Sequence, residues 1–73
     1  MSEKTLGEVR VRTDFNVSGS STVDEIKQKS AELINLVDSL PVESGPSEKK
    51  RLISLAQTAY EEAAMWAVKA ATC

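Results

Sequence analysis

Residues 51–73 read RLISLAQTAYEEAAMWAVKAATC, and this stretch decides the fold of the chain. Apolar residues recur in it at spacings of three and four, which is typical of an α-helix that packs along a partner. Two neighbouring rows follow this spacing. The first row is Leu52, Ala56, Ala59, Ala63, Trp66 and Ala70. The second row is Ile53, Tyr60, Ala64, Ala67 and Ala71. One partner helix can cover only one of these rows.

The uncovered row predicts self-association, because the chain has no third long apolar segment to cover it. We therefore expect another copy of the same chain to do so, with Tyr60, Ala64 and Trp66 at contacts between subunits. The many alanines would let helix backbones approach closely. The alternative is a monomer whose alanine content reflects only that Ala is the best helix former.

The composition predicts one small domain without a metal or cofactor. The chain has 73 residues, a single cysteine (Cys73) and no histidine. This length predicts one domain over residues 1–73. No internal disulfide can form, and the commonest zinc ligand is missing. Self-association is then the remaining source of extra stability for so short a chain. Cys73 is expected to be an inert thiol.

Charge and hydropathy limit the kinds of partner that the chain is expected to bind. The net charge is −2, and no broad basic surface is encoded, so we expect no binding to long nucleic acid. The N-terminal residues lack the apolar core of a signal peptide, and no run of about 18 apolar residues exists. These features predict a cytoplasmic protein with no membrane partner. A small anionic ligand is compatible with this net charge, because its binding needs only a few well-placed donors.

The second apolar-periodic segment lies before Pro41. Its expected seam is Val23, Ile26, Leu33, Val37 and Leu40, with Ile34 and Leu36 widening the seam and Ser30 interrupting it. We predict one helix over residues 22–40, with Thr22 and Glu25 as a capping box, and a second over residues 47–71, with Ser47 as its N-cap. A short connector between two long amphipathic helices predicts an all-α fold, an antiparallel helical hairpin.

The first 21 residues are expected to form an arm and a loop. Residues 9–15, VRVRTDF, alternate apolar and polar side chains, which predicts an extended arm lying on the helices or on a neighbouring subunit. Residues 16–21, NVSGSS, predict a loop in which Gly19 can take a positive φ.

Residue chemistry favours binding over catalysis. Without histidine, Ser and Cys nucleophiles lack their usual base, so no enzyme is expected. The loop before the first long helix offers backbone N–H groups that suit a phosphate, and Lys27 follows one turn later. Phe15 lies between the arm and the loop, where it could stack on a base. The alternative is that Phe15 plugs the open end of the hairpin core, and residue chemistry alone favours the plug.

Several motifs resemble a known family. The run Glu61–Ala70, EEAAMWAVKA, and the segments RTDFN (residues 12–16), Ser18-Gly19 and Val23-Asp24-x-Ile26-Lys27 are similar to the hairpin domain shared by phage anti-CBASS cyclic-nucleotide sponges and the Thoeris anti-defence sponge. The resemblance implies a compact homo-oligomer, a hexamer in the best-known members. It also implies that the protein sequesters cyclic oligonucleotide immune signals without cleaving them, and so blocks CBASS effectors.

The resemblance also implies site residues. A pocket between protomers for cyclic dinucleotides, such as cyclic GMP-AMP, would use Lys27 and an aromatic residue, for which Phe15 is an approximate match. The expected ligand-binding residues are Arg10, Arg12, Phe15, Asn16, Ser18, Gly19 and Lys27. Arg51 is the candidate for a second site that takes cyclic trinucleotides. Relatives carry the aromatic on a short N-terminal helix, which a loop is expected to replace here. The alternative function is an adaptor hairpin that binds a host protein through its apolar face.

Overall fold

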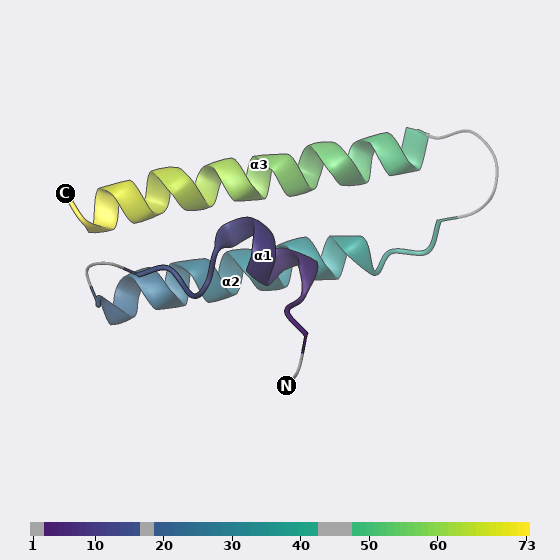
Figure 1. Cartoon of the computed structure of the whole chain (residues 1–73). Helices are drawn as coiled ribbons and strands as arrows, with labels where there is room; N and C mark the ends of the chain where they lie inside the picture. Colours follow the sequence, from purple (N-terminus) through teal and green to yellow (C-terminus); the bar gives the residue numbers. More distant parts are fainter. Residues whose placement is uncertain (1–2, 17–18, 43–47) are drawn as a thin grey trace.

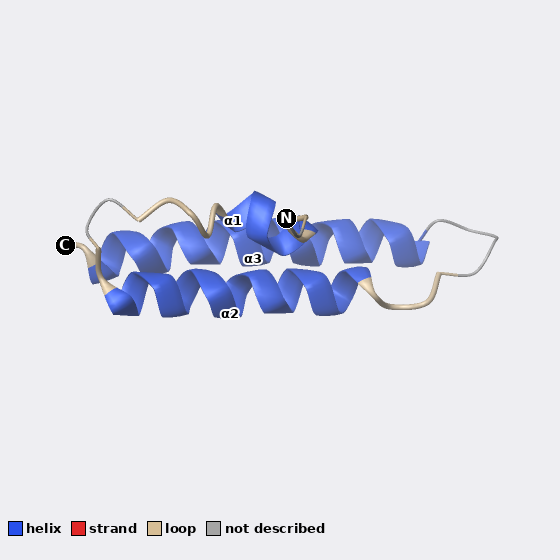
Figure 2. Ribbon diagram, turned by 60° about the horizontal axis from the view of Figure 1, so that its bottom comes forward, coloured by secondary structure: helices blue, strands red, loops and turns tan. Residues whose placement is uncertain are grey.

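The computed structural model describes residues 3–16, 19–42 and 48–73. Three helices follow one another in these ranges: α1 (Leu6–Val11), α2 (Ser21–Asp38) and α3 (Glu48–Ala71). The two long helices lie antiparallel and side by side, and the short α1 lies against them (Figures 1 and 2). The described residues contain no strand. The expected all-α helical hairpin is therefore confirmed.

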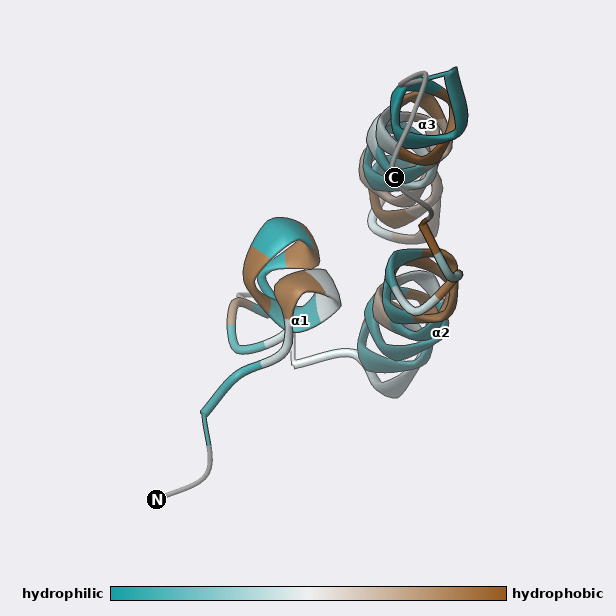
Figure 3. Ribbon diagram, turned by 90° about the vertical axis from the view of Figure 1, so that its right-hand side faces the viewer, coloured by the Kyte–Doolittle hydropathy of each residue, from teal (hydrophilic) through white to brown (hydrophobic). Residues whose placement is uncertain are grey.

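Helix α1 packs beside α2 rather than between the two long helices. Figure 3 looks along the hairpin and shows α3 stacked on α2, with α1 to one side. Most contacts of α1 are with α2, and fewer are with α3. The hairpin therefore has three packed elements, and the cavity described below lies where they meet.

The core is small and joins all three helices. Val11, Ala31, Ile34 and Ala64 are buried together, with Tyr60 packed against them, and Ile34 is fully buried. On α3 the second row therefore faces α2. The first row faces outward: Leu52 is 52% exposed and Trp66 60%.

A buried amide accompanies these apolar contacts. Gln57 is buried on α3, and its Nε2 donates to the carbonyl oxygen of Ile34 at 3.1 Å and to Oδ1 of Asp38 at 3.3 Å. Burying an amide costs free energy unless it is hydrogen-bonded, and here it is. These bonds tie the middle of α3 to the C-terminal half of α2.

The buried face of α2 differs from the expected seam. The buried residues are Val23, Lys27, Ala31 and Ile34, of which Val23 and Ile34 were expected. Three expected leucines are exposed instead: Leu33 at 42%, Leu36 at 64% and Leu40 at 44%. The expectation for these leucines was wrong because α2 packs against α1 as well as α3. The face between these two neighbours is the one that becomes buried.

The helix ends also differ from the expected ones. The N-cap of α2 is Ser20, whose hydroxyl accepts from the Val23 N–H, so Thr22 is not the cap. Helix α2 ends at Asp38, two residues before Leu40, and the Ser39 hydroxyl donates to the Leu36 carbonyl at 2.7 Å. Ser47, the expected N-cap of the next helix, lies outside the described residues.

The expectation of an extended arm was wrong, because residues 6–11 form α1. A capping box starts this helix: the Thr5 hydroxyl accepts from the Glu8 N–H, and the Glu8 carboxylate accepts from the Thr5 N–H at 2.9 Å. These bonds lower the pKa of Glu8. The alternation of Val9 and Val11 does not reflect a shared face, since Val11 is buried and Val9 is 58% exposed.

A close backbone contact fixes α1 on α2. A Cβ added at Gly7 would overlap the backbone of Ala31, whose carbonyl carbon would lie 2.7 Å away. The Gly7 N–H donates to Oδ1 of Asn35 at 2.8 Å, and Asn35 Nδ2 donates to the Thr5 hydroxyl at 2.9 Å. Asn35 thus fixes the start of α1 on α2.

Candidate functional site

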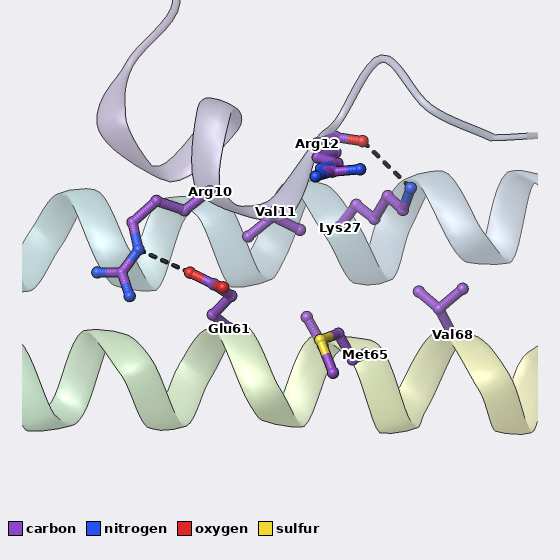
Figure 4. A pocket seen from close by; sticks show the side chains of 8 residues that line it. Arg10, Val11, Arg12, Lys27, Glu61, Met65 and Val68 are labelled. Carbon is purple, nitrogen blue, oxygen red and sulfur yellow. Dashed lines mark hydrogen bonds and ion pairs between the residues drawn. The ribbon is translucent and has the colours of Figure 1, made fainter.

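A cavity of about 470 Å³ lies between the three helices. Its lining comes from the end of α1, the second turn of α2 and the second half of α3 (Figure 4). The lining residues are Arg10, Val11, Arg12, Lys27, Glu61, Ala64, Met65 and Val68. Four of these lining residues are apolar and four are charged. Its volume lies within the range of small-molecule sites, about 300–1,000 Å³.

Lys27 is the buried cation of this site. Lys27 is only 7% exposed. Its ammonium donates to the carbonyl oxygen of Arg12 at 3.1 Å and to that of Phe15 (Figure 4 draws the first of these bonds). The same Nζ lies 5.5 Å from the centroid of the Phe15 ring, within the range of a cation–π contact. Lys27 thus joins α2 to the turn that follows α1.

Phe15 does not plug the hairpin core. Phe15 is 61% exposed, and the core consists of Val11, Ala31, Ile34 and Ala64 with Tyr60 packed against them. The exposed ring is instead attached to the cavity wall through Lys27. An exposed aromatic ring beside cations is the arrangement that can stack on a base while phosphates are neutralised nearby.

Arg12 ends α1 in the left-handed conformation, with φ 60° and ψ 58°. Its carbonyl accepts from the Phe15 N–H at 2.9 Å as well as from Lys27. Its side chain is exposed and lines the cavity. The expectation that a loop replaces the N-terminal helix was therefore wrong: α1 is present, and Phe15 follows it in the turn.

Arg10 is held by an acidic partner on α3. Its Nε lies 2.7 Å from Oε1 of Glu61, and one terminal nitrogen donates to the Thr58 hydroxyl at 3.3 Å. Sequence reasoning did not place Glu61, Met65 or Val68 in the site. Their spacing of four and three shows that they share a helix face. The contact of this face with α1 could not be predicted, because an extended arm was expected where the structure has α1.

Asn16 and Gly19 shape the loop before α2. Asn16 Nδ2 donates to the Ser20 carbonyl at 2.7 Å and to Oδ1 of Asp24 at 2.8 Å. Gly19 has φ 66°, as its expected positive φ requires, and its N–H donates to the Asn16 carbonyl at 3.2 Å. Both residues therefore make loop contacts. Ser18 lies outside the described residues.

Arg51 lies away from this cavity. The first turn of α3 is at the opposite end of the hairpin from the start of α2 (Figure 1). There Arg51 Nε lies 2.7 Å from Oε1 of Glu48, and a terminal nitrogen lies 2.8 Å from Oε2. This pairing lowers the pKa of Glu48 and raises the pKa of Arg51.

The residues expected at subunit contacts fall into two environments. Ala64 is in the core of the chain, and Tyr60 is partly buried against it. Trp66 is exposed, with the Lys69 ammonium 5.5 Å from its ring centroid. Within a single chain, Trp66 therefore offers a free surface and Ala64 does not.

Two further properties concern the described residues alone. Residues 3–16, 19–42 and 48–73 contain no group of three or more acidic, Cys or His side chains placed to hold a metal ion. None of the helices in these ranges has both the length and the apolarity that crossing a membrane requires.

Comparison with known protein families matches residues 6–72 to the Acb2/Tad1 hairpin domain. The match spans nearly the whole chain and includes all three helices. The chain belongs to this family. Acb2/Tad1 proteins are the anti-CBASS and anti-Thoeris sponges, which act in phage anti-defence by binding signals. Searches of curated proteins and of solved structures gave no match.

Proposed function

We propose that this Acb2/Tad1 hairpin protein binds a cyclic dinucleotide, such as cyclic GMP-AMP, at the cavity between its helices. The observation that carries the proposal is the exposed Phe15 ring, which Lys27 joins to a cavity rimmed by Arg12. Aromatic stacking contributes about 1–3 kcal/mol per base in nucleic-acid complexes. The Arg12 guanidinium would contact phosphate, where its planar donors suit the oxygens.

The bound signal would be held and not cleaved. The chain has no histidine, so the usual general base for phosphodiester hydrolysis is missing. Glu61 is the acid in the cavity, and its carboxylate is already paired with Arg10. A ligand kept intact but out of solution would leave a CBASS-type effector inactive in the cytoplasm of the host cell.

The functional unit would be a homo-oligomer, with the hexamer of the related sponges as the expected form. Apolar side chains on the outer faces support this: Leu52, Leu55 and Trp66 on α3, and Leu33 and Leu36 on α2, are exposed in the single chain. Covering them removes apolar surface from water. A neighbouring subunit would then close the open side of the cavity.

A second ligand site would use Arg51 for a cyclic trinucleotide. Arg51 is exposed and lies at the opposite end of the hairpin from the start of α2, so the two sites would not overlap. Binding there would require the guanidinium to exchange its Glu48 contact for a phosphate.

Calorimetry with a panel of cyclic di- and trinucleotides tests this proposal. We expect Phe15→Ala to weaken dinucleotide binding about ten- to a hundredfold, since about 1.4 kcal/mol is a factor of ten. Lys27→Ala is expected to act similarly. Arg51→Ala is the control and should leave dinucleotide affinity unchanged. Heat denaturation followed by chromatography should return intact ligand, and a hydrolysed product that accumulates with time would refute the sponge function.

The exposed apolar faces also support a different function, that of an adaptor that binds a host protein. Its observable would be a large apolar patch that stays exposed in the free oligomer. Binding of a hydrophobic dye to the ligand-free oligomer separates the two functions, because a closed sponge buries these faces between its own subunits.

A further inference from the structure

We infer that the carboxylate of Glu61 selects guanine in the bound dinucleotide, by accepting hydrogen bonds from the Watson–Crick edge of one base. This inference rests on the proposed function and names the base that the site prefers. Among the described residues that line the cavity, Glu61 is the only acid. The phosphates of the ligand carry negative charge, so a carboxylate in their cavity cannot serve to bind them. Its position points to contact with another part of the ligand.

Arg10 occupies only one of the two carboxylate oxygens. Its Nε donates to Oε1 at 2.7 Å, while a terminal nitrogen donates to the Thr58 hydroxyl at 3.3 Å. Within the described part of the chain, Oε2 of Glu61 accepts no hydrogen bond. In the pair of Arg51 and Glu48, by contrast, the guanidinium contacts both oxygens, at 2.7 and 2.8 Å. Thr58 thus turns the Arg10 guanidinium away from Oε2, which stays open to a ligand.

This open oxygen lies at one end of the cavity. Figure 4 shows Arg10 and Glu61 at that end and Lys27 and Val68 at the other. Glu61 and Val68 are seven residues apart on α3, which corresponds to about 10 Å along the helix. Met65 lies between them and lines the same cavity. Its polarizable thioether suits contact with the ring of a base.

The choice of base follows from the donors that each base presents. A carboxylate only accepts hydrogen bonds. Guanine presents two neighbouring donors, the N1–H and the 2-amino group. Adenine and cytosine each present an amino group beside a ring nitrogen acceptor, which a carboxylate repels, and uracil presents one N–H between two carbonyls. Glu61 therefore favours guanine over the other three bases.

The ion pair makes an acid compatible with an anionic ligand. The guanidinium of Arg10 offsets the negative charge of Glu61, so the pair adds no net charge to the cavity. The Glu61 side chain is 37% exposed, so water competes only in part for Oε2. A site whose polar groups are built to bond a ligand group rejects analogues that lack this group.

The first test uses the unchanged protein and ligands that differ at one base. Calorimetry compares cyclic GMP-AMP, cyclic IMP-AMP and cyclic di-AMP. We expect cyclic GMP-AMP to bind tighter than cyclic di-AMP by about tenfold or more, the effect of hydrogen bonds to a charged group. Cyclic IMP-AMP, whose hypoxanthine differs from guanine only by lacking the 2-amino group, should bind with intermediate affinity. Equal affinities for cyclic GMP-AMP and cyclic di-AMP would overturn the inference.

The second test assigns this preference to Glu61. In Glu61→Gln, Arg10 can keep the amide oxygen as its acceptor, and the amide N–H groups then meet the donors of guanine. We expect the ratio of the affinities for cyclic GMP-AMP and cyclic di-AMP to fall about tenfold. Glu62→Gln is the matched control, because Glu62 is exposed and outside the cavity lining, and its loss changes the net charge equally. It should leave the ratio unchanged.

The ratio removes effects on folding, since a loosened α1 weakens both ligands alike. Circular dichroism checks that each variant is helical. A folded Glu61→Gln protein with the wild-type ratio would overturn the inference. If Glu61→Gln does not fold, Thr58→Val replaces it: without the hydroxyl, Arg10 can close on both oxygens of Glu61, and the ratio should also fall. A folded Thr58→Val protein with the wild-type ratio would then overturn the inference.

The outcomes separate the inference from the proposed function. Tight binding of cyclic dinucleotides without preference for guanine would leave the sponge function standing and refute the role of Glu61. If the unchanged protein binds none of the three ligands, the proposed function fails, and the inference fails with it.

Discussion

Nε of Arg10 lies 2.7 Å from Oε1 of Glu61, and this ion pair joins α1 to α3 beside the cavity. The two side chains are 24% and 37% exposed, so solvent screens the pair only in part. Since α1 packs mostly on α2, this pair is the charged link between the N-terminal helix and the C-terminal one. Both side chains line the cavity, so the pair borders it between α1 and α3.

Removing either partner is therefore expected to loosen α1. Arg10→Met and Glu61→Gln should each lower the free energy of unfolding by about 1 kcal/mol, the net value of one hydrogen bond in a protein. The double variant should lose less than the sum of the two, because both single changes break the same pair. Urea denaturation followed by circular dichroism measures this. Strict additivity would show that the pair contributes nothing to stability.

Gly7→Ala tests how closely α1 approaches α2. Helix propensity alone predicts a gain of about 0.5–1 kcal/mol for replacing a helical glycine by alanine. The overlap of the new Cβ with the Ala31 backbone predicts a loss instead, of about 1–3 kcal/mol. Thermal unfolding decides the sign.

Gly19→Ala is the control for this prediction. Gly19 has φ 66° and nothing within 4 Å of an added Cβ. The only cost of alanine at this position is then the left-handed backbone conformation, which lowers the free energy of unfolding by about 1–2 kcal/mol. Gly19→Ala should leave the contact between α1 and α2 intact, which amide hydrogen exchange in α1 can show. A stabilised Gly7→Ala protein would mean that α1 does not sit against Ala31.

The capping box predicts an effect of pH on α1. Hydrogen bonds from the Thr5 backbone and side chain hold the pKa of Glu8 below its ordinary value of 4.5. A lowered pKa in the folded state means that the contribution of Glu8 is fully present above pH 4.5. It is lost as the pH falls through the lowered pKa. Exchange of α1 amides should therefore accelerate in acid, while Glu8→Gln, which keeps a capping side chain, should remove that part of the dependence.

Substitutions on the two faces of α3 should separate folding from assembly. Ala64 is 4% exposed inside the core, so Ala64→Glu is expected to unfold the hairpin by burying a charge. Leu52→Ser together with Trp66→Ser changes exposed positions and should keep helicity while lowering the mass measured by light scattering. A monomeric mass for the unchanged protein at micromolar concentration would refute the oligomer.

Sequence periodicity predicted the hairpin because it depends on spacing within each long helix. It could not tell which apolar row of α3 faces α2. Both rows have helical spacing, and the choice depends on buried partners such as Gln57, a polar residue that the apolar pattern ignores.

The N-terminal helix was missed for a different reason. Six residues are too short for a periodicity to be read, and the alternation of Val9 and Val11 imitated a strand. The signal that could have found α1 is the capping box of Thr5 and Glu8, the same motif that was assigned to Thr22 and Glu25. This error also affected the prediction of the candidate site. Glu61, Met65 and Val68 line the cavity together with residues at the end of α1, and α1 was not expected.

The docking of α1 has a consequence for how the protein opens. Of its six residues, all of which the structure describes, only Gly7 and Val11 are buried, and polar bonds from Gly7 to Asn35 and from Arg10 to Glu61 add to the docking. Detaching α1 would therefore uncover less apolar surface than unfolding the whole hairpin, namely Val11 and the α2 residues that it covers. The response of an opening reaction to urea scales with the surface it uncovers. Amides of α1 should thus exchange at rates that depend less on urea than the rates of amides in α2 and α3.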